Sequence, residues 1–96
     1  MIFSPEAASD LAGLYDFLTE SAGPERARVW LGRFEAHCLS FEIAAERGAR
    51  RDDIRPGLRI SSFERRITLA FTVTPTQVLF LRFFYAGANW EPTLSD

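Results

Sequence analysis

The chain has 96 residues and a mass of 10.9 kDa, with 47% hydrophobic and 25% charged residues. This composition excludes an intrinsically disordered or collagen-like chain, and the length supports one hydrophobic core. A single domain over residues 1–96 is therefore expected. The lone cysteine, Cys38, excludes an internal disulfide and indicates a reducing compartment. Because neither a run of ~20 apolar residues nor an export signal is found, a cytoplasmic protein is predicted.

Charge is distributed unevenly along the chain. Residues 1–46 hold three Arg and eight acidic residues, whereas residues 47–82 hold eight Arg and three acidic residues. The two segments therefore carry −5 and +5, within a total of −2. This asymmetry fits either a polyanionic or acidic partner, or charges that simply segregate by structural element. All eleven cations are Arg, whose planar guanidinium suits carboxylate or phosphate.

The first 46 residues predict a short strand and a helical hairpin. Ile2-Phe3 is typical of an edge strand, and Ser4-Pro5 supplies an N-cap and a first-turn proline for a helix. Gly23-Pro24 ends that helix and begins a second one. Each helix has an apolar stripe with the helical period. The stripes comprise Ala7, Ala8, Leu11, Leu14, Tyr15, Leu18 and Ala22 on the first helix, and Ala27, Trp30, Leu31, Phe34, Cys38, Phe41 and Ala45 on the second.

Large apolar side chains also lie outside these stripes, among them Phe17 on the first helix and Leu39 and Ile43 on the second. We expect them to mediate contact between the helices while both stripes pack on a sheet. The alternative is that they form an exposed partner site.

The second half of the chain predicts strands. Residues 47–57 are polar and close with Pro56-Gly57, which indicates a loop. Residues 58–63 form a weak strand, and residues 67–73 alternate apolar and small or polar side chains with a period of two. Residues 78–85 are almost wholly apolar, as in a central strand covered on both faces. The predicted fold is α+β, with the order β-α-α-β-β-β and an N-terminal α-helical hairpin on one face of an antiparallel sheet.

Enzyme motifs are missing from the sequence. It contains no P-loop, glycine-rich dinucleotide loop or nucleophile elbow. One histidine and one cysteine do not complete a zinc site, and no metal or cofactor is expected. His37 lies at the margin of the second stripe without a neighbouring nucleophile, and Cys38 lies inside the stripe as a small buried residue. Neither is expected to be catalytic.

Asp52 and Asp53 are the acidic residues most suggestive of a metal site. They lie beside Arg50, Arg51 and Arg55, and we expect these cations to neutralise them.

Arg82 interrupts an otherwise apolar strand, where a charge is costly unless it is paired or used. Arg59 and Arg65-Arg66 are expected near it across the sheet. One interpretation is an anion-binding or partner-binding face. The other is an ion pair with Glu64 or Glu91, or exposure at the strand end.

The segment from Tyr85 to Pro92 follows the last strand and contains two aromatic residues. Such side chains in a C-terminal loop can stack on a base or anchor a protein partner. For Trp90 we favour a role in closing the open end of the core.

Four segments of the sequence contain distinctive patterns. They are Phe3 to Ala7 leading into Asp10-Leu11 and Tyr15 to Phe17, then Gly48 to Arg59, Ile67 to Val73, and Leu81 to Glu91. The most specific parts are the R-x-D-[ILV]-R-x-G-x-R pattern and the strand followed by G-x-[DN]-W-E. Together, in this order and over nearly the whole chain, they resemble ParE toxins of the RelE/ParE toxin–antitoxin superfamily.

The resemblance implies a cytoplasmic toxin that inhibits DNA gyrase by binding, without catalytic residues, and that a ParD-like antitoxin holds inactive in a hetero-oligomer. Neither membrane association nor sequence-specific nucleic-acid binding by the toxin alone is implied. The candidate target-binding residues are Arg59, Arg82, Tyr85, Asn89, Trp90 and Glu91. A groove beside the hairpin and the sheet suits the antitoxin. Its candidate lining residues are Phe17, Phe63, Phe80 and Phe84, with ordinary core positions as the alternative.

Two other functions are open at this point. RelE-like relatives cut mRNA in the ribosome, which requires cationic and acid–base side chains on the sheet. Here Arg59, Arg82 and Tyr85 are the members available for such a set. Tyr85 stands where many relatives have His, and Ala88 where they have Arg, and both departures weaken the ribonuclease interpretation. An inactive family member is the third possibility.

Overall fold

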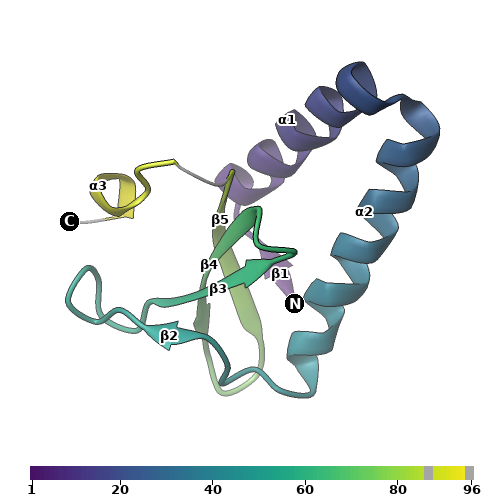
Figure 1. The fold of residues 1–96 in the computed structure, drawn as a ribbon. Helices are drawn as coiled ribbons and strands as arrows, with labels where there is room; N and C mark the ends of the chain where they lie inside the picture. The colour runs from purple at the N-terminus through teal and green to yellow at the C-terminus, as the bar shows by residue number, and fades with distance from the viewer. Residues whose placement is uncertain (86–87, 95–96) are drawn as a thin grey trace.

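The computed structural model describes residues 1–85 and 88–94, and it places a helical hairpin on one face of a five-stranded sheet (Figure 1). The strand order is β1-β5-β4-β3-β2, so the first and last strands of the chain are neighbours. The predicted α+β fold is confirmed. Its elements are β1 (Ile2–Phe3), α1 (Pro5–Ala22), α2 (Pro24–Leu39), η1 (Ser40–Glu42), β2 (Ala49–Arg50), β3 (Arg59–Phe63), β4 (Ile67–Val73), β5 (Val78–Tyr85) and α3 (Glu91–Leu94).

No helix within the described ranges is both long enough and apolar enough to cross a lipid bilayer.

Local sequence sets the limits of the two long helices. The Oγ of Ser4 accepts a hydrogen bond from the N–H of Ala7 at 3.0 Å, and Pro5 occupies the first turn of α1. Gly23 ends α1, and its N–H donates to the carbonyl of Thr19 at 3.1 Å. Its φ of 95° lies in a region that strains residues with a side chain, which explains the glycine. Both boundaries agree with the prediction.

The sheet is mixed, whereas the sequence predicted an antiparallel one. β1 runs parallel to β5, with Ile2 opposite Leu79, and the other three pairings are antiparallel. A strand of two residues is too short for its side-chain pattern to indicate a direction. The same limit explains β2, which lies in the segment predicted to be a loop. Because both of its residues are exposed, no apolar alternation marks it.

A β-bulge in β5 determines which side chains enter the main core. Ala70 pairs with Arg82, but the next residue of β4, Phe71, pairs with Phe80, so Leu81 is an extra residue. As a result Phe80 and Phe83 both join the core beneath the helices, although they are three positions apart. A regular period of two would place them on opposite faces.

The main core fills the space between the helical hairpin and the sheet and is rich in phenylalanine. Phe34 of α2 has edge-to-face contacts with Phe63 and Phe83, whose ring centroids lie 5.3 and 5.0 Å away. Phe41 of η1 contacts Phe71 at 5.0 Å in the same manner. The core thus joins α2 and η1 to three strands.

A second cluster covers the opposite face of the sheet. It comprises Leu58, Ala70, Phe84 and Leu94, with Trp90 packed against it. The short helix α3 carries Leu94 into this cluster, whereas the sequence predicted a loop here. One helical turn contains too few residues to show a period. The predicted role of Trp90 in closing the core is confirmed.

The predicted burial of Phe17, Leu39 and Ile43 between the helices is wrong. Their exposed fractions are 54%, 51% and 93%. The hairpin extends beyond the sheet at its turn (Figure 1), and Ala7 is the one residue of α1 that is buried. The outer half of the hairpin therefore has only one apolar surface to pack against, and Phe17 stays exposed there. Leu39, the last residue of α2, and Ile43, which follows η1, lie at the other end of the hairpin, and their side chains face solvent.

Asp10 joins α1 to the edge of β5. Its carboxylate accepts hydrogen bonds from Arg82 Nε at 2.7 Å, Arg82 Nη2 at 3.1 Å and the backbone N–H of Phe83 at 3.0 Å. Nearby, the Oγ of Ser4 donates to the carbonyl of Leu81 at 2.7 Å. Because β1 pairs with only two residues of β5, these side chains satisfy backbone groups of the edge that β1 leaves open.

Replacing Asp10 is expected to destabilise the fold. Asp10→Ala removes the partner of a largely buried guanidinium and of a backbone N–H, so the free energy of unfolding should fall by about 2 kcal/mol. Asp10→Asn keeps one acceptor and should cost roughly half as much. Urea denaturation measures both. Asp16→Ala, an exposed carboxylate of the same helix, is the control, and equal losses for Asp10→Ala and Asp16→Ala would contradict the assignment.

Shortening Leu94 tests the second cluster. Leu94→Ala creates a cavity against Leu58, Ala70 and Phe84 and should lower the free energy of unfolding by about 2–3 kcal/mol. The exposed neighbour Thr93→Ala should have little effect. If thermal melts of the two variants coincide, α3 does not contribute to the core.

Candidate partner-binding groove

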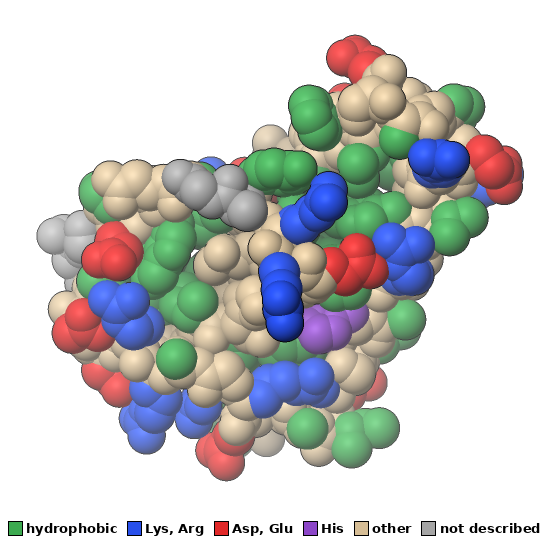
Figure 2. All heavy atoms as spheres, in the orientation of Figure 1, with side chains coloured by type: hydrophobic (Ala, Val, Ile, Leu, Met, Phe, Trp, Pro, Cys, Tyr) green, Lys and Arg blue, Asp and Glu red, His purple; other side chains and the backbone are tan. Residues whose placement is uncertain are grey.

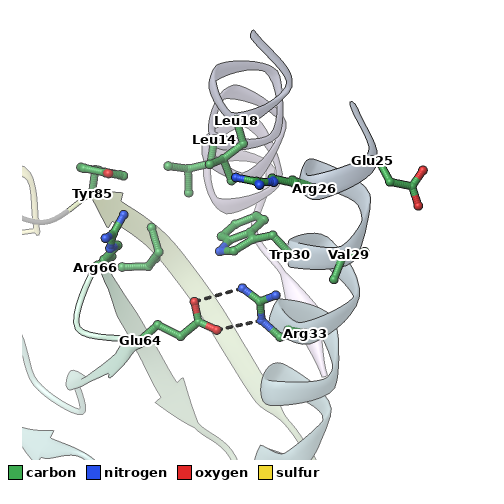
Figure 3. A pocket seen from close by; sticks show the side chains of 11 residues that line it. Leu14, Leu18, Glu25, Arg26, Val29, Trp30, Arg33, Glu64, Arg66 and Tyr85 are labelled. Atoms are coloured by element: carbon green, nitrogen blue, oxygen red, sulfur yellow. Dashed lines mark hydrogen bonds and ion pairs between the residues drawn. The ribbon is translucent and has the colours of Figure 1, made fainter. Parts of the chain in front are cut away.

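A hollow of about 550 Å³ opens between the outer half of the hairpin and the end of the sheet (Figure 3). Its apolar part comes from the inner side chains of the helices and from the strand ends, where Ile67 and Tyr85 pair. Figure 2 shows hydrophobic side chains gathered between the hairpin and the sheet, with basic side chains beside them. We call this hollow the hairpin groove. Its lining residues are Leu14, Leu18, Glu25, Arg26, Val29, Trp30, Arg33, Glu64, Arg66, Ile67 and Tyr85.

The rim of the hairpin groove has an excess of unpaired positive charge. Arg33 binds Glu64 as a fork, with Nε and Nη2 donating to the two carboxylate oxygens at 2.8 and 3.3 Å. This hydrogen bonding raises the pKa of the Arg33 guanidinium. Among the described residues, Arg26 and Arg66 have no ion-pair partner. Two cations therefore remain available to acidic groups of a ligand.

The turn between β3 and β4 positions two of these rim residues. Glu64 and Arg65 have φ values of 52° and 59°, and the N–H of Arg66 donates to the carbonyl of Phe63 at 3.0 Å. Glu64 and Arg65 are the central residues of a turn from Phe63 to Arg66, and a hairpin turn with two positive φ values normally uses Asn and Gly there. The strained turn holds Glu64 opposite Arg33 and directs Arg66 to the groove (Figure 3).

Tyr85 connects the hairpin groove with the surface of α1. Its ring lies against that of Phe17 with a centroid distance of 6.0 Å, and both rings are exposed. The sequence assigned Tyr85 to the target-binding set and Phe17 to the antitoxin-binding set. In the fold the two residues form one aromatic ridge along the groove.

The other three phenylalanines assigned to the antitoxin groove lie inside the protein. Phe63 and Phe80 belong to the main core, and Phe84 belongs to the second cluster. Each is at most 9% exposed. The assignment is therefore corrected for these three residues, because the bulged sheet is covered on both faces and leaves their rings no surface. Phe17 stays a candidate.

The target-binding candidates on the sheet lie apart from one another. Arg59 borders a small hollow with Glu46 and Arg50, whereas Arg82 borders another with Asp10. The predicted partners of Arg82 were Glu64 and Glu91, but its partner is Asp10. The sequence could not indicate this pair, because its members are 72 positions apart.

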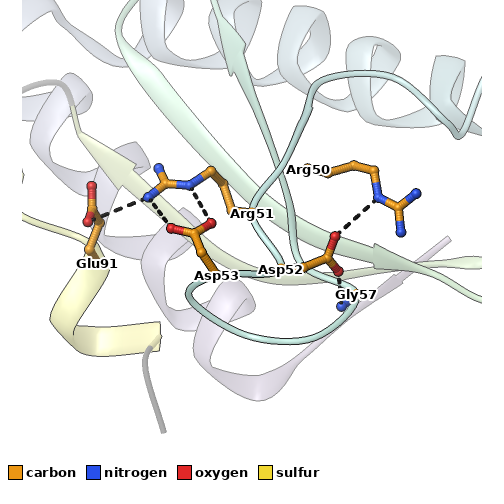
Figure 4. Close-up of polar contacts among 6 residues, drawn as sticks. All are labelled: Arg50, Arg51, Asp52, Asp53, Gly57 and Glu91. Carbon is orange, nitrogen blue, oxygen red and sulfur yellow. Dashed lines mark hydrogen bonds and ion pairs between the residues drawn. The ribbon is translucent and has the colours of Figure 1, made fainter.

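Asp52 and Asp53, which follow β2, are neutralised by neighbouring arginines, as predicted (Figure 4). Asp52 binds Arg50 at 3.3 Å and accepts the N–H of Gly57 at 2.8 Å. Asp53 accepts two hydrogen bonds from Arg51 at 3.0 Å, which lower the pKa of Asp53. These aspartates are therefore partners of arginine and not the start of a metal site. Within residues 1–85 and 88–94, no group of three or more His, Cys, Asp or Glu side chains is arranged to hold a metal ion.

Arg51 also contacts two of the target-binding candidates in the C-terminal segment, Trp90 and Glu91. Its guanidinium lies 5.4 Å from the ring centre of Trp90 and 3.7 Å from the carboxylate of Glu91. Asn89 is exposed. Ala86 and Gly87, which belong to a segment that carries the family resemblance, lie outside the described residues.

The side chains of His37 and Cys38 pack against or within the main core. The ring of His37 lies 5.0 Å from Phe63 and 5.3 Å from Phe41, and burial, followed by the charge of Arg47, lowers its pKa. Burial raises the pKa of the Cys38 thiol to about 12. At neutral pH this thiol is protonated and a poor nucleophile.

Residues of the groove rim were missed by the sequence reading. Arg26 and Arg33 gave no signal, because an exposed charge on a helix is ordinary, and Glu64 was considered only as a partner of Arg82. Only the fold brings α2 and the β3–β4 turn together.

Comparison with known proteins identifies the family. A family model described as the ParE toxin of the type II toxin–antitoxin system parDE matches residues 1–90. A solved structure titled "Chromosomal ParDE TA system from P. aeruginosa" has a chain that is 27% identical, with a TM-score of 0.73 over 86% of this chain and 90% of that one. No curated protein matches the sequence. Since the family model spans nearly the entire chain, this protein belongs to the ParE toxin family of type II toxin–antitoxin systems.

Proposed function

We propose that this chain is a cytoplasmic toxin that inhibits DNA gyrase by binding and that a ParD-like antitoxin neutralises it. The observation that carries the proposal is the family match together with an open apolar groove whose rim has unpaired arginines. The similar structure from P. aeruginosa belongs to a ParDE system, which supports an antitoxin as partner.

The hairpin groove suits an amphipathic segment of the antitoxin. Leu14, Leu18 and Trp30 offer apolar surface to one face of such a segment. Arg26 and Arg66 would bind carboxylates on its flanks. An acidic and apolar peptide is therefore the expected ligand.

The arrangement of the sheet residues favours inhibition by binding over mRNA cleavage. A ribonuclease needs its cationic and acid–base groups around one scissile phosphate. Arg82 is engaged by Asp10, Arg59 borders a different hollow, and Tyr85 lies beside Phe17. These three groups do not converge, whereas a surface that only binds its target does not require convergence.

The gyrase proposal is tested with the purified chain, gyrase and relaxed plasmid. We expect inhibition of supercoiling together with trapped DNA cleavage. Arg59→Ala and Asn89→Ala are each expected to weaken inhibition at least about fivefold, because truncating a residue at the centre of an interface costs about 1 kcal/mol or more. Arg28→Ala, an exposed arginine of α2, is the matched control.

No inhibition by protein with a cooperative melt would contradict the gyrase target. A ribosome-dependent mRNA cleavage assay then decides between the remaining functions, with Tyr85→Phe as the informative variant. Arg82→Ala is less suitable because it leaves Asp10 without its partner.

The antitoxin site is tested by placing a charge in the groove. Val29→Asp introduces a carboxylate at an exposed position of the lining, where it opposes an acidic, apolar ligand. Cells expressing this variant should stay growth-arrested when the cognate antitoxin is co-expressed, with binding weakened at least about tenfold. Ile43→Asp, an exposed apolar residue outside the groove, should still be neutralised. Equal neutralisation of both variants would place the antitoxin elsewhere.

A further inference from the structure

The surface around Phe17 has a self-complementary order of charges and apolar groups. On one side of Phe17 lies the hairpin groove, whose rim carries Arg26 and Arg66, two cations without an ion-pair partner in the part of the chain that the structure describes. On the other side lie Asp16 and Glu20, which are exposed and have no ion-pair partner within the described ranges. A basic groove, an aromatic ridge and an acidic flank thus follow one another across the surface.

Helix geometry fixes this order. At about 100° per residue, Leu14 and Leu18 lie roughly 60 to 100° to one side of Phe17 on α1, and Asp16 and Glu20 lie as far to the other side. Leu14 and Leu18 line the hairpin groove. The acidic pair therefore points away from the groove of its own chain and cannot neutralise Arg26 and Arg66.

We propose that the chain without antitoxin forms a two-fold symmetric dimer through this surface. A two-fold axis at the ridge of Phe17 and Tyr85 reverses the sequence of groove, ridge and acidic flank in the second copy. Each acidic flank therefore faces the basic rim of the other chain. The two Phe17 rings, each 54% exposed in the single chain, then meet at the axis, while the acidic flank of each copy lies over the groove of the other. Charge complementarity across the axis and burial of the two exposed rings point to the same occupant, a second copy.

The dimer does not depend on the gyrase target. Only one consequence rests on the proposed function: the antitoxin and the second copy exclude each other, because both would occupy the hairpin groove.

The test measures the mass of the full chain in solution, by sedimentation velocity, over about a hundredfold range of concentration. The wild-type chain should reach twice the monomer mass of 10.9 kDa. Phe17→Asp should weaken association at least about tenfold. Ile43→Asp, with 93% exposure, makes the same kind of change elsewhere and should associate like the wild type. A monomeric wild type, or equal association of Phe17→Asp, would overturn the proposal.

Charge reversal provides a second, sharper test that does not rely on an apolar residue. Asp16→Arg with Glu20→Arg, and Arg26→Glu with Arg66→Glu, should each give monomers. Mixed one to one, the two variants should form a heterodimer, because both of its charge contacts are then complementary. A chain with Arg50→Glu and Arg55→Glu has the same net charge as the second variant and should not pair with the first. Failure of the mixture to associate, or pairing of this control, would overturn the proposal. Circular dichroism confirms that every variant is folded, and neither antitoxin nor gyrase is needed.

Discussion

The carboxylate of Asp10 is the contact that holds the two layers of this protein in register. It binds Arg82 and the N–H of Phe83, and so fixes α1 along an edge of β5 that the two-residue strand β1 leaves open. Because the bulge at Leu81 lies beside this contact, Phe80 and Phe83 both enter the core beneath the helices. A charge in a central strand, which on its own would be costly, is thereby part of the scaffold.

The position of α1 also explains why the hairpin groove exists. The beginning of α1 is tied to β5, but its outer half and that of α2 extend past the sheet and leave apolar side chains partly open (Figure 1). One fork between Arg33 and Glu64 connects α2 to the β3–β4 turn across this opening. Exposed ion pairs contribute little to stability, so the pair orders the rim more than it stabilises the fold.

Arginine has two different roles in this chain. At the end of β2 and in the loop after it, Arg50 and Arg51 are matched by Asp52 and Asp53. Arg51 additionally contacts Trp90 and the start of α3 (Figure 4). At the groove, Arg26 and Arg66 have no such partner among residues 1–85 and 88–94. A count of charges along the sequence does not distinguish these two groups of arginines. The folded structure does, because it shows which arginines are paired with a carboxylate.

Several features followed from the sequence by itself. The helical hairpin and the three long strands were predictable because caps, Gly-Pro and periodicity act over a few residues. The family resemblance, which the family model supports, rests on ordered local motifs. Tertiary structure alone decided the partner of Arg82, the parallel direction of β1, the burial of Phe63, Phe80 and Phe84, and the groove rim. Each of these depends on contacts between distant residues or on strands too short to show a period, and local sequence carries no record of such contacts.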